Sequence, residues 1–292
     1  MNERARIAST LMFAALLVTG CAPLNKDGLP TASPEPNAKI DIGGRGLYYM
    51  CTGTGLPTVI VETGLGIGGI GDSTWSKVTP EIAKTNRICF YDRAGLGLSD
   101  SAPTPRTSRE VAEDLHLLLT NAHIGPPYLL VGHSIGGLHA ATYASQFPDE
   151  VAGLVLVDST LPDRAYFEAA FATAFPGEAL PTPSTPDPRF MKEGLDIPAS
   201  LEQLQSVASL GDIPLIVISH HLVEMPSVTG ISPNTVQLYD LAYLGACNEF
   251  ASLSSKGSVV FSDTISHFVQ SEDPEVVIEA IRQVLESVDG EN

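Results

Sequence analysis

Basic residues are scarce in this chain of 292 residues, which has 16 lysines and arginines against 34 aspartates and glutamates and a formal net charge of −18. So little positive charge cannot neutralise the phosphates of DNA or RNA, and we expect no nucleic-acid partner. The same charge keeps a protein soluble and favours neutral substrates over anionic ones. Apolar residues make up 43% of the chain, enough for a large hydrophobic core, which argues against disorder.

The sequence also lacks the short motifs that hold nucleotides. Its glycine-rich stretch, residues 64–71, has no Lys-Ser or Lys-Thr pair of the kind that completes a phosphate-binding loop. His220, His221 and Glu224 raise the possibility of a metal site. Adjacent side chains at a strand end point in opposite directions, however, and rarely bind one ion together. We therefore expect no cofactor and no metal.

The first 20 residues have the pattern of an export signal. Arg4 and Arg6 precede a mostly apolar stretch, residues 7–18, which is too short to span a bilayer comfortably. The segment ends in Leu-Val-Thr-Gly-Cys at residues 17–21, which resembles the lipobox of bacterial lipoprotein signal peptides. The resemblance implies cleavage before Cys21, diacylglycerol on its thiol and a lipid anchor in the bacterial cell envelope. The alternative is a simple secretory signal with a nearby cysteine.

Prolines and a glycine interrupt regular structure directly after this cysteine, at Pro23, Gly28, Pro30, Pro34 and Pro36. This composition is typical of an extended linker. The sequence predicts a signal peptide over residues 1–20, a tether over residues 21–38 that holds the domain off a membrane, and one domain over residues 39–292.

Export changes the interpretation of the three remaining cysteines, because an oxidising compartment allows two of them to pair. Cys51 ends the strand-like run at residues 46–51, and Cys89 lies early in the run at residues 87–91. If these strands lie side by side and antiparallel, the two thiols meet. We expect a Cys51–Cys89 disulfide with Cys247 free; the alternative is three buried thiols.

Strand and helix patterns alternate from residue 39 onward. Short apolar runs predict strands over residues 46–51, 57–62, 87–91, 128–131, 151–157, 214–218 and 258–261. Apolar residues at helical spacing predict a helix over residues 75–83, one that Thr107 and Glu110 open with a capping box, one after Ser134, and one that begins at Asp273. Repeated β-α units with near-continuous apolar strands imply an α/β fold with a parallel sheet covered on both faces.

Residues 160–211 interrupt this alternation. Phe167, Phe171 and Phe175 lie at helical spacing, and a proline-rich stretch and a second helical pattern over residues 199–210 follow. A connection of this length is uncommon unless it has a function of its own. We expect a helical lid across the strand ends.

The most informative motif is Gly-His-Ser-Ile-Gly at residues 132–136, which follows an apolar strand directly and opens a helix. This is the Gly-x-Ser-x-Gly nucleophile elbow, a turn so sharp that the serine side chain projects into open space. A Cβ at Gly132 or Gly136 would collide with neighbouring backbone. The motif predicts that Ser134 is a nucleophile. The alternative is a tight turn between strand and helix in which the serine has no catalytic role.

Taken in order, the motifs resemble those of the α/β-hydrolase superfamily over residues 39–292, and more narrowly its bacterial esterase-like members. The resemblance is carried by Glu-Thr-Gly at residues 62–64, Tyr-Asp-Arg-Ala-Gly at 91–95, Val-Gly-His-Ser at 131–134 and Leu-Val-Leu-Val-Asp at 154–158. It implies a mostly parallel eight-stranded sheet with helices on both faces and a helical lid. It says little about the substrate, because this fold hosts many chemistries.

A serine hydroxyl needs a base to take its proton. Of the seven histidines, the resemblance indicates His267, just past the last strand, as this base, whereas we expect the His133 side chain to point away from the nucleophile. Most family members carry the acid in the loop after the penultimate strand. In this chain that loop follows the strand at residues 214–218, and Glu224 is its only carboxylate. Some lidded members take it from the end of the strand after the elbow helix, where Asp158 stands. We favour Asp158 and keep Glu224 as the alternative.

The tetrahedral intermediate of acyl transfer needs hydrogen-bond donors for its oxyanion. The N–H of Ile135, directly after the nucleophile, is the natural first donor. The second should come from the loop after the strand at residues 57–62. The family usually has a His-Gly pair where this chain has Thr63-Gly64, which leaves the Leu65 N–H as the expected second donor.

The sequence therefore predicts a lipid-anchored serine hydrolase that cleaves a carboxylic ester, ahead of an amide, thioester or lactone, through an acyl-enzyme intermediate. Its partners would be a small ester-like substrate and, through Cys21, a membrane. Two alternatives stay open. An acyltransferase would use an alcohol in place of water, and a binding module would keep the fold without turnover.

Overall fold

The computed structural model describes residues 37–160, 192–220, 233–264 and 266–289. The expected signal peptide, Cys21, the three lid phenylalanines and Glu224 lie outside the described residues. The expected tether lies outside them too, except at its end, where Asn37 and Ala38 already belong to the first strand.

The described strands are β1 (Asn37–Asp41), β2 (Gly46–Thr52), β3 (Thr58–Glu62), β4 (Ile88–Tyr91), β5 (Tyr128–His133), β6 (Val151–Val157), β7 (Leu215–His220) and β8 (Gly257–Ser262). The described helices are η1 (Gly69–Gly71), η2 (Ser73–Trp75), α1 (Thr79–Ile82), α2 (Ser108–Asn121), α3 (Ile135–Gln146), η3 (Pro148–Glu150), α6 (Ile197–Gln205), α8 (Pro233–Ala251), α9 (Val269–Glu272) and α10 (Pro274–Asp289). None of these helices is both long and apolar enough to cross a membrane.

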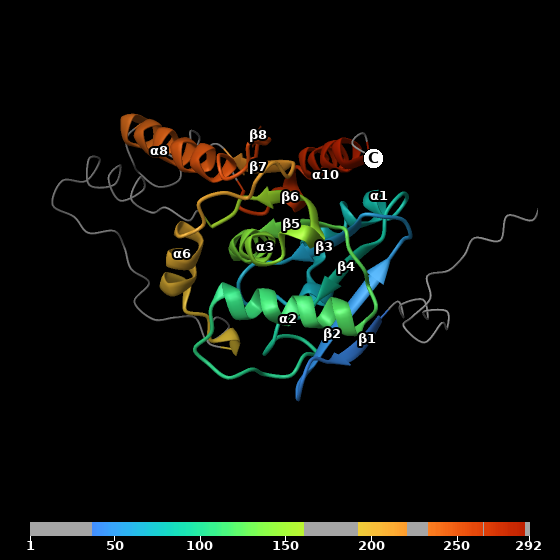
Figure 1. Ribbon diagram of the computed structural model, residues 1–292. Coiled ribbons are helices and arrows are strands. Elements are labelled where there is room, and N and C mark those ends of the chain that lie inside the picture. The colour runs from blue at the N-terminus through green and yellow to red at the C-terminus, as the bar shows by residue number, and fades with distance from the viewer. Residues whose placement is uncertain (1–36, 161–191, 221–232, 265, 290–292) are drawn as a thin grey trace, which may run out of the picture. The chain divides into compact units, whose positions relative to one another are not determined.

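All eight strands form one sheet in the order β1-β2-β4-β3-β5-β6-β7-β8 (Figure 1). β2 runs antiparallel to both of its neighbours, and the other pairs are parallel. The expected mostly parallel eight-stranded sheet is confirmed. β1 was not expected, because its alternating sequence is half exposed at the sheet edge and has no apolar run.

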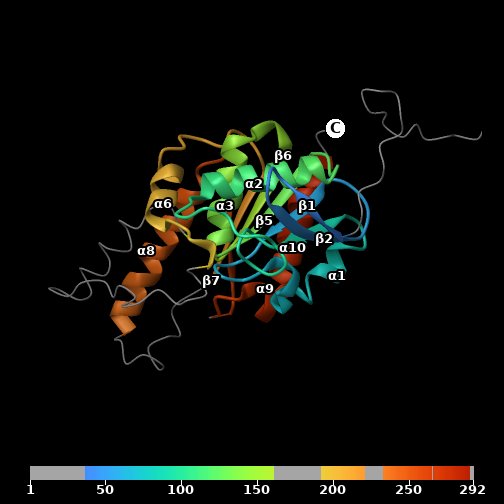
Figure 2. The same ribbon diagram turned by 90° about the horizontal axis from the view of Figure 1, so that it is seen from below.

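Helices cover both faces of the sheet (Figures 1 and 2). On one face, alternate strand residues such as Leu130 and Leu156 pack against α2, α3, α6 and the end of α8. On the other face, residues such as Val131 and Val157 pack against Trp75, α1, α9 and α10. Strands that are buried on both faces explain the continuous apolar runs in the sequence.

The helix boundaries follow local chemistry. α2 begins with the expected capping box, in which the Thr107 backbone N–H donates to Glu110 at 2.7 Å. The helix expected over residues 75–83 is instead two short pieces, η2 and α1, and Pro80 lies in the first turn of the second. α6 replaces the helical pattern expected over residues 199–210, and α8 was not expected at all.

Cys51 and Cys89 occupy directly paired positions on the antiparallel strands β2 and β4. They form a disulfide with an S–S distance of 2.02 Å. Cys247 is free and buried in α8, and burial raises the pKa of its thiol to about 11. This thiol is therefore neutral at physiological pH.

The sheet register aligns the carboxyl ends of the central strands. The aligned pairs at this edge are Glu62 with Gly132, His133 with Val157, Val157 with Ile218, and His220 with Ser262. The loops that leave β3, β5, β6, β7 and β8 therefore begin side by side. β3 and β5 also flank the point where the strand order reverses, which is where open α/β sheets bind ligands.

Candidate active site

Ser134 lies at the sharp turn between β5 and α3. Its φ of 56° and ψ of −125° are strained for a residue with a side chain. A Cβ at Gly132 would lie 2.5 Å from the Gly136 carbonyl oxygen, and a Cβ at Gly136 would lie 2.2 Å from that of Glu62. The two flanking glycines are required because backbone approaches them so closely. This is the geometry of the nucleophile elbow that the motif predicts.

His267 follows β8 and contacts Asp158 at the end of β6. Its Nδ1 lies 2.5 Å from Asp158 Oδ2. Its side chain is 47% exposed, whereas that of Asp158 is 2% exposed. His267 and Ser134 line the same cavity, which has a volume of about 340 Å³. The structure thus brings the expected nucleophile, base and acid to one edge of the sheet.

Two further side chains hold the other oxygen of Asp158. His220 Nδ1 and the Tyr243 hydroxyl each lie 2.8 Å from Asp158 Oδ1. Burial alone would raise the pKa of Asp158, but hydrogen bonds from His220 and His267 lower it to about 2. An ionised carboxylate only accepts hydrogen bonds, so Nδ1 of both histidines carries the hydrogen. The Nε2 of His267 is then left as the acceptor that a general base requires.

His133 does not point away from the site, contrary to expectation. Its ring centroid lies 4.7 Å from that of His267, and its Nε2 donates to the His267 carbonyl at 2.9 Å. Burial and the neighbouring His267 lower the pKa of His133 to about 4, so its ring is neutral at physiological pH. The His133 side chain thus reaches the loop after β8, where its hydrogen bond holds the backbone carbonyl of His267.

The loop after β3 forms the facing wall of the cavity. The wall consists of Gly64, Leu65, Gly66 and Ile67, and the other described residues that line the cavity are His133, Ser134, His267 and Phe268. Of the two expected oxyanion donors, Leu65 lines the cavity together with Ser134, and Ile135 follows Ser134 directly in the chain. Leu65 belongs to the loop after β3, and Ile135 is the first residue of α3, whose positive dipole end faces the site.

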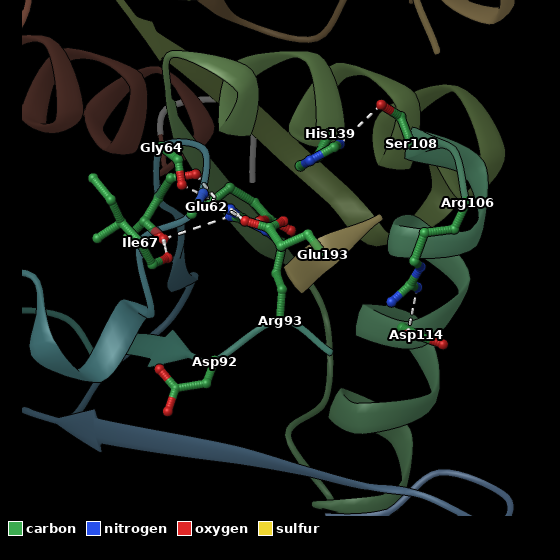
Figure 3. A network of polar contacts seen from close by, with 12 residues as sticks. Glu62, Gly64, Ile67, Asp92, Arg93, Arg106, Ser108, Asp114, His139 and Glu193 are labelled. Carbon is green, nitrogen blue, oxygen red and sulfur yellow. Dashed lines mark hydrogen bonds and ion pairs between the residues drawn. The ribbon is translucent and has the colours of Figure 1, made fainter. Parts of the chain in front are cut away.

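A buried ion cluster lies behind this wall (Figure 3). Arg93, which is 2% exposed, pairs with Glu193 at 2.9 Å and with Glu62 at 3.4 Å. Burial raises the pKa of Glu62 to about 7, against the lowering effect of Arg93 and of the Tyr91 hydroxyl. The cluster therefore holds a permanent positive charge between two carboxyl groups.

Sequence reasoning missed His220, Tyr243 and Glu193 as neighbours of the site. His220 ends β7, the strand after which family members were expected to carry their acid, and this position was the one available signal. Tyr243 and Glu193 come from α8 and from residues just before α6, and nothing in the local sequence indicates their contacts. Glu224, the alternative acid, lies outside the described residues.

Comparison with known proteins agrees with this architecture. The profile of the alpha/beta hydrolase fold family matches residues 57–219. The uncharacterized protein YqjL of Bacillus subtilis is 28% identical over 230 residues, which cover 78% of this chain and 83% of that protein.

Two solved structures show the same fold. A thermophilic esterase from Thermogutta terrifontis has a TM-score of 0.58 at 23% identity and covers 86% of this chain and 98% of its own. A bromoperoxidase from Bacillus anthracis has a TM-score of 0.57 at 19% identity, with 86% and 99% covered. These neighbours are named for different activities, so the similarity indicates the fold and does not indicate a substrate. The chain belongs to the alpha/beta hydrolase fold family.

Proposed function

We propose that this protein is a serine hydrolase that cleaves a carboxylic ester, or a related acyl bond, through an acyl-enzyme intermediate. One observation carries the proposal. An ionised, buried Asp158 contacts Nδ1 of His267, and His267 shares a cavity with the elbow serine, Ser134. This arrangement supplies a nucleophile, a base in the correct tautomer and an acid that orients the base.

In the acylation step, Ser134 Oγ attacks the carbonyl carbon while Nε2 of His267 takes the hydroxyl proton. The carbonyl oxygen becomes an oxyanion, which accepts hydrogen bonds from the N–H groups of Leu65 and Ile135. When the intermediate collapses, the bond from the carbonyl carbon to the alkoxy oxygen breaks. The leaving alcohol takes the proton from His267, and the acyl group stays on Ser134.

In the second step, water replaces the alcohol. His267 takes a proton from the water as it attacks the acyl carbon, and the same two N–H groups hold the second oxyanion. Collapse releases the carboxylic acid and returns the proton to Ser134. Asp158 stays ionised throughout, because its pKa of about 2 lies far below physiological pH.

The cavity supports a neutral substrate. Glycine, leucine, isoleucine and phenylalanine form most of its wall, and among the described residues no lysine, arginine, aspartate or glutamate lines it. A volume of about 340 Å³ is at the lower end for small-molecule sites. Together with the net charge of −18, this wall disfavours anionic acyl or alcohol groups.

The test is a panel of chromogenic esters of rising acyl chain length, with added alcohol to detect acyl transfer. Ser134→Ala is expected to lower turnover by about 10⁴- to 10⁶-fold. Ser206→Ala, at an exposed position after α6, serves as the matched control and is expected to keep full activity. Turnover that survives in Ser134→Ala would refute the proposal.

We propose in addition that the chain is exported and anchored to a membrane of the bacterial envelope through a lipid on Cys21. The Cys51–Cys89 disulfide supports export, because such bonds persist in oxidising compartments. Detergent phase partitioning tests the anchor. Wild-type protein is expected in the detergent phase and Cys21→Ser in the aqueous phase. Equal partitioning of the two would refute the anchor.

A further inference from the structure

The Arg93 side chain binds backbone carbonyl groups of the loop after β3 in addition to forming its ion pairs with Glu62 and Glu193 (Figure 3). Its Nη1 donates to the Thr63 carbonyl and its Nη2 to the Gly64 carbonyl, both at 2.7 Å. Glu193 adds a third contact to the same loop, because its Oε1 accepts the Gly66 N–H at 2.6 Å. Two charged side chains thus fix three successive peptide groups of the cavity wall.

These contacts determine the direction of the Leu65 N–H. In a planar trans peptide, the carbonyl and the N–H of the same unit point in opposite directions. The Gly64 carbonyl and the Leu65 N–H share one such unit, and the Gly64 carbonyl faces the Arg93 guanidinium. The Leu65 N–H therefore points away from Arg93. Leu65 lines the cavity, whereas Arg93 is buried behind the wall and is not among the lining residues described.

The loop needs such support because glycines flank Leu65 on both sides. Gly66 has a φ of 72°, a conformation that glycine adopts without strain, and Gly64 has no Cβ to limit its rotation. A flip of the Gly64–Leu65 peptide would turn the carbonyl toward the cavity in place of the N–H. A carbonyl there would repel an oxyanion. Arg93 opposes this flip by holding the Gly64 carbonyl at 2.7 Å, a shorter contact than the one that the same carbonyl accepts from the Ile67 N–H at 3.3 Å.

Glu193 is itself well anchored. The residue after it, Gly194, accepts the backbone N–H of Arg106 at 2.9 Å, and Asp196 donates its N–H to the Arg106 carbonyl at 2.7 Å. The Glu193 carboxylate meets Nε and Nη2 of Arg93 at 2.9 and 3.0 Å, a two-pronged pairing that only a guanidinium can make.

We infer that Arg93 and Glu193 are positioning residues for the reaction: they lock the Gly64–Leu65 peptide so that the Leu65 N–H faces the developing oxyanion. The inference rests on the proposed function, in which that N–H is a donor. It assigns no contact with substrate to either side chain. Loss of the contacts from Arg93 and Glu193 to this loop therefore weakens stabilisation of the transition state and leaves binding of the substrate in its ground state nearly unchanged.

The experiment compares kcat and KM of Arg93→Met, Arg93→Lys and Glu193→Gln on one chromogenic ester. Each protein also receives a pair of inhibitors, a trifluoromethyl ketone that forms an oxyanion on Ser134 and the matching methyl ketone, which binds without adding readily. Arg106→Met is the matched control, because Arg106 is also a buried arginine paired with a carboxylate, Asp114, at 2.6 Å. This substitution keeps the backbone bonds of Arg106 to Gly194 and Asp196.

Arg93→Met is expected to lower kcat by about 10²- to 10³-fold, the effect of losing one oxyanion donor, with KM within about threefold. Its affinity for the trifluoromethyl ketone should fall in parallel, and its affinity for the methyl ketone should not. Arg93→Lys should lie between the wild type and Arg93→Met, because an ammonium cannot reach both carbonyls and Glu193 together. Glu193→Gln should lose about tenfold in kcat. Arg106→Met should lose thermal stability but keep kcat within about threefold.

The inference is overturned if folded Arg93→Met keeps its kcat, or if Arg106→Met loses as much kcat. If Arg93→Met does not fold, unchanged kcat in both Arg93→Lys and Glu193→Gln overturns it, and selective loss of kcat in them supports it. A wild-type protein without ester turnover would overturn the proposed function and the inference with it. Wild-type turnover with unaffected variants would overturn the inference alone.

Discussion

Replacing Asp158 by asparagine should invert the tautomer of His267. Oδ1 of Asp158 accepts from His220 and from Tyr243, both at 2.8 Å. An asparagine would turn its carbonyl oxygen toward these two donors, which leaves its amide NH₂ against Nδ1 of His267. That nitrogen would then have to accept, and the proton would move to Nε2, where it blocks transfer from Ser134.

The expected magnitude follows from the loss of the base. A triad with the wrong tautomer loses about 10⁴-fold in kcat, which corresponds to about 5 kcal/mol of transition-state stabilisation. Little of this loss should appear in KM, because Asp158 does not line the cavity among the described residues. The assay is steady-state turnover of a chromogenic ester from about pH 5 to pH 10, together with thermal unfolding of each variant.

Two matched variants sharpen this test. Asp114→Asn removes another buried carboxylate, one that pairs with Arg106 at 2.6 Å, and should lower stability without lowering kcat. Glu224→Gln should change kcat by less than about threefold, because the proposed acid is Asp158 and not Glu224. A folded Asp158→Asn protein with more than about a tenth of wild-type kcat would refute the reasoning. A large loss confined to Glu224→Gln would transfer the role of the acid to Glu224.

Three further changes have defined outcomes. Burial raises the pKa of Glu62 from 4.5 to about 7, so folding favours its protonated form. The raised pKa of Glu62 contributes to the free energy of unfolding below about pH 4.5, and this contribution is lost as the pH rises through about 7. Urea unfolding should therefore show the wild type losing up to about 3 kcal/mol more than Glu62→Gln between pH 4.5 and pH 8, and equal losses would contradict the assignment. Replacing both Cys51 and Cys89 by alanine should lower the free energy of unfolding, measured by chemical denaturation, by about 3–4 kcal/mol. The disulfide joins two residues with a sequence separation of 38 and therefore restricts the unfolded chain. Tyr243→Phe removes a donor from Asp158 and should raise the pKa of that carboxyl and lower kcat by about 3- to 10-fold; an unchanged kcat would show that the hydroxyl does not support the acid.

Features that depend on neighbouring residues in the sequence could be predicted. The elbow glycines, the capping box of Thr107 and Glu110, and the buried central strands each follow from local sterics or hydrogen bonding. The strand that follows the elbow helix brings Asp158 to the same sheet edge as Ser134, whereas the assignment of His267 depends on the resemblance to the α/β-hydrolase superfamily. Parallel strands share that edge in any sheet of this kind, whatever the details of the loops.

Features that depend on contacts between distant segments could not be predicted. The direction of the His133 side chain follows from the strained turn at Ser134 together with the loop after β8. The sequence shows only that His220 and His221 are adjacent and point in opposite directions, whereas the partner of His220 is Asp158, which follows a different strand. The pairing of Arg93 with Glu193 spans 100 residues of sequence. The structure alone shows that they meet behind the cavity wall.

The most direct test of the central claim is covalent labelling by a fluorophosphonate, followed by peptide mapping of the modified residue. One label per molecule is expected, located on Ser134. It should be absent from Ser134→Ala, and its formation should be strongly slowed in His267→Ala. Labelling of a different residue, or labelling that persists in Ser134→Ala, would contradict the claim that Ser134, His267 and Asp158 act together as a catalytic triad.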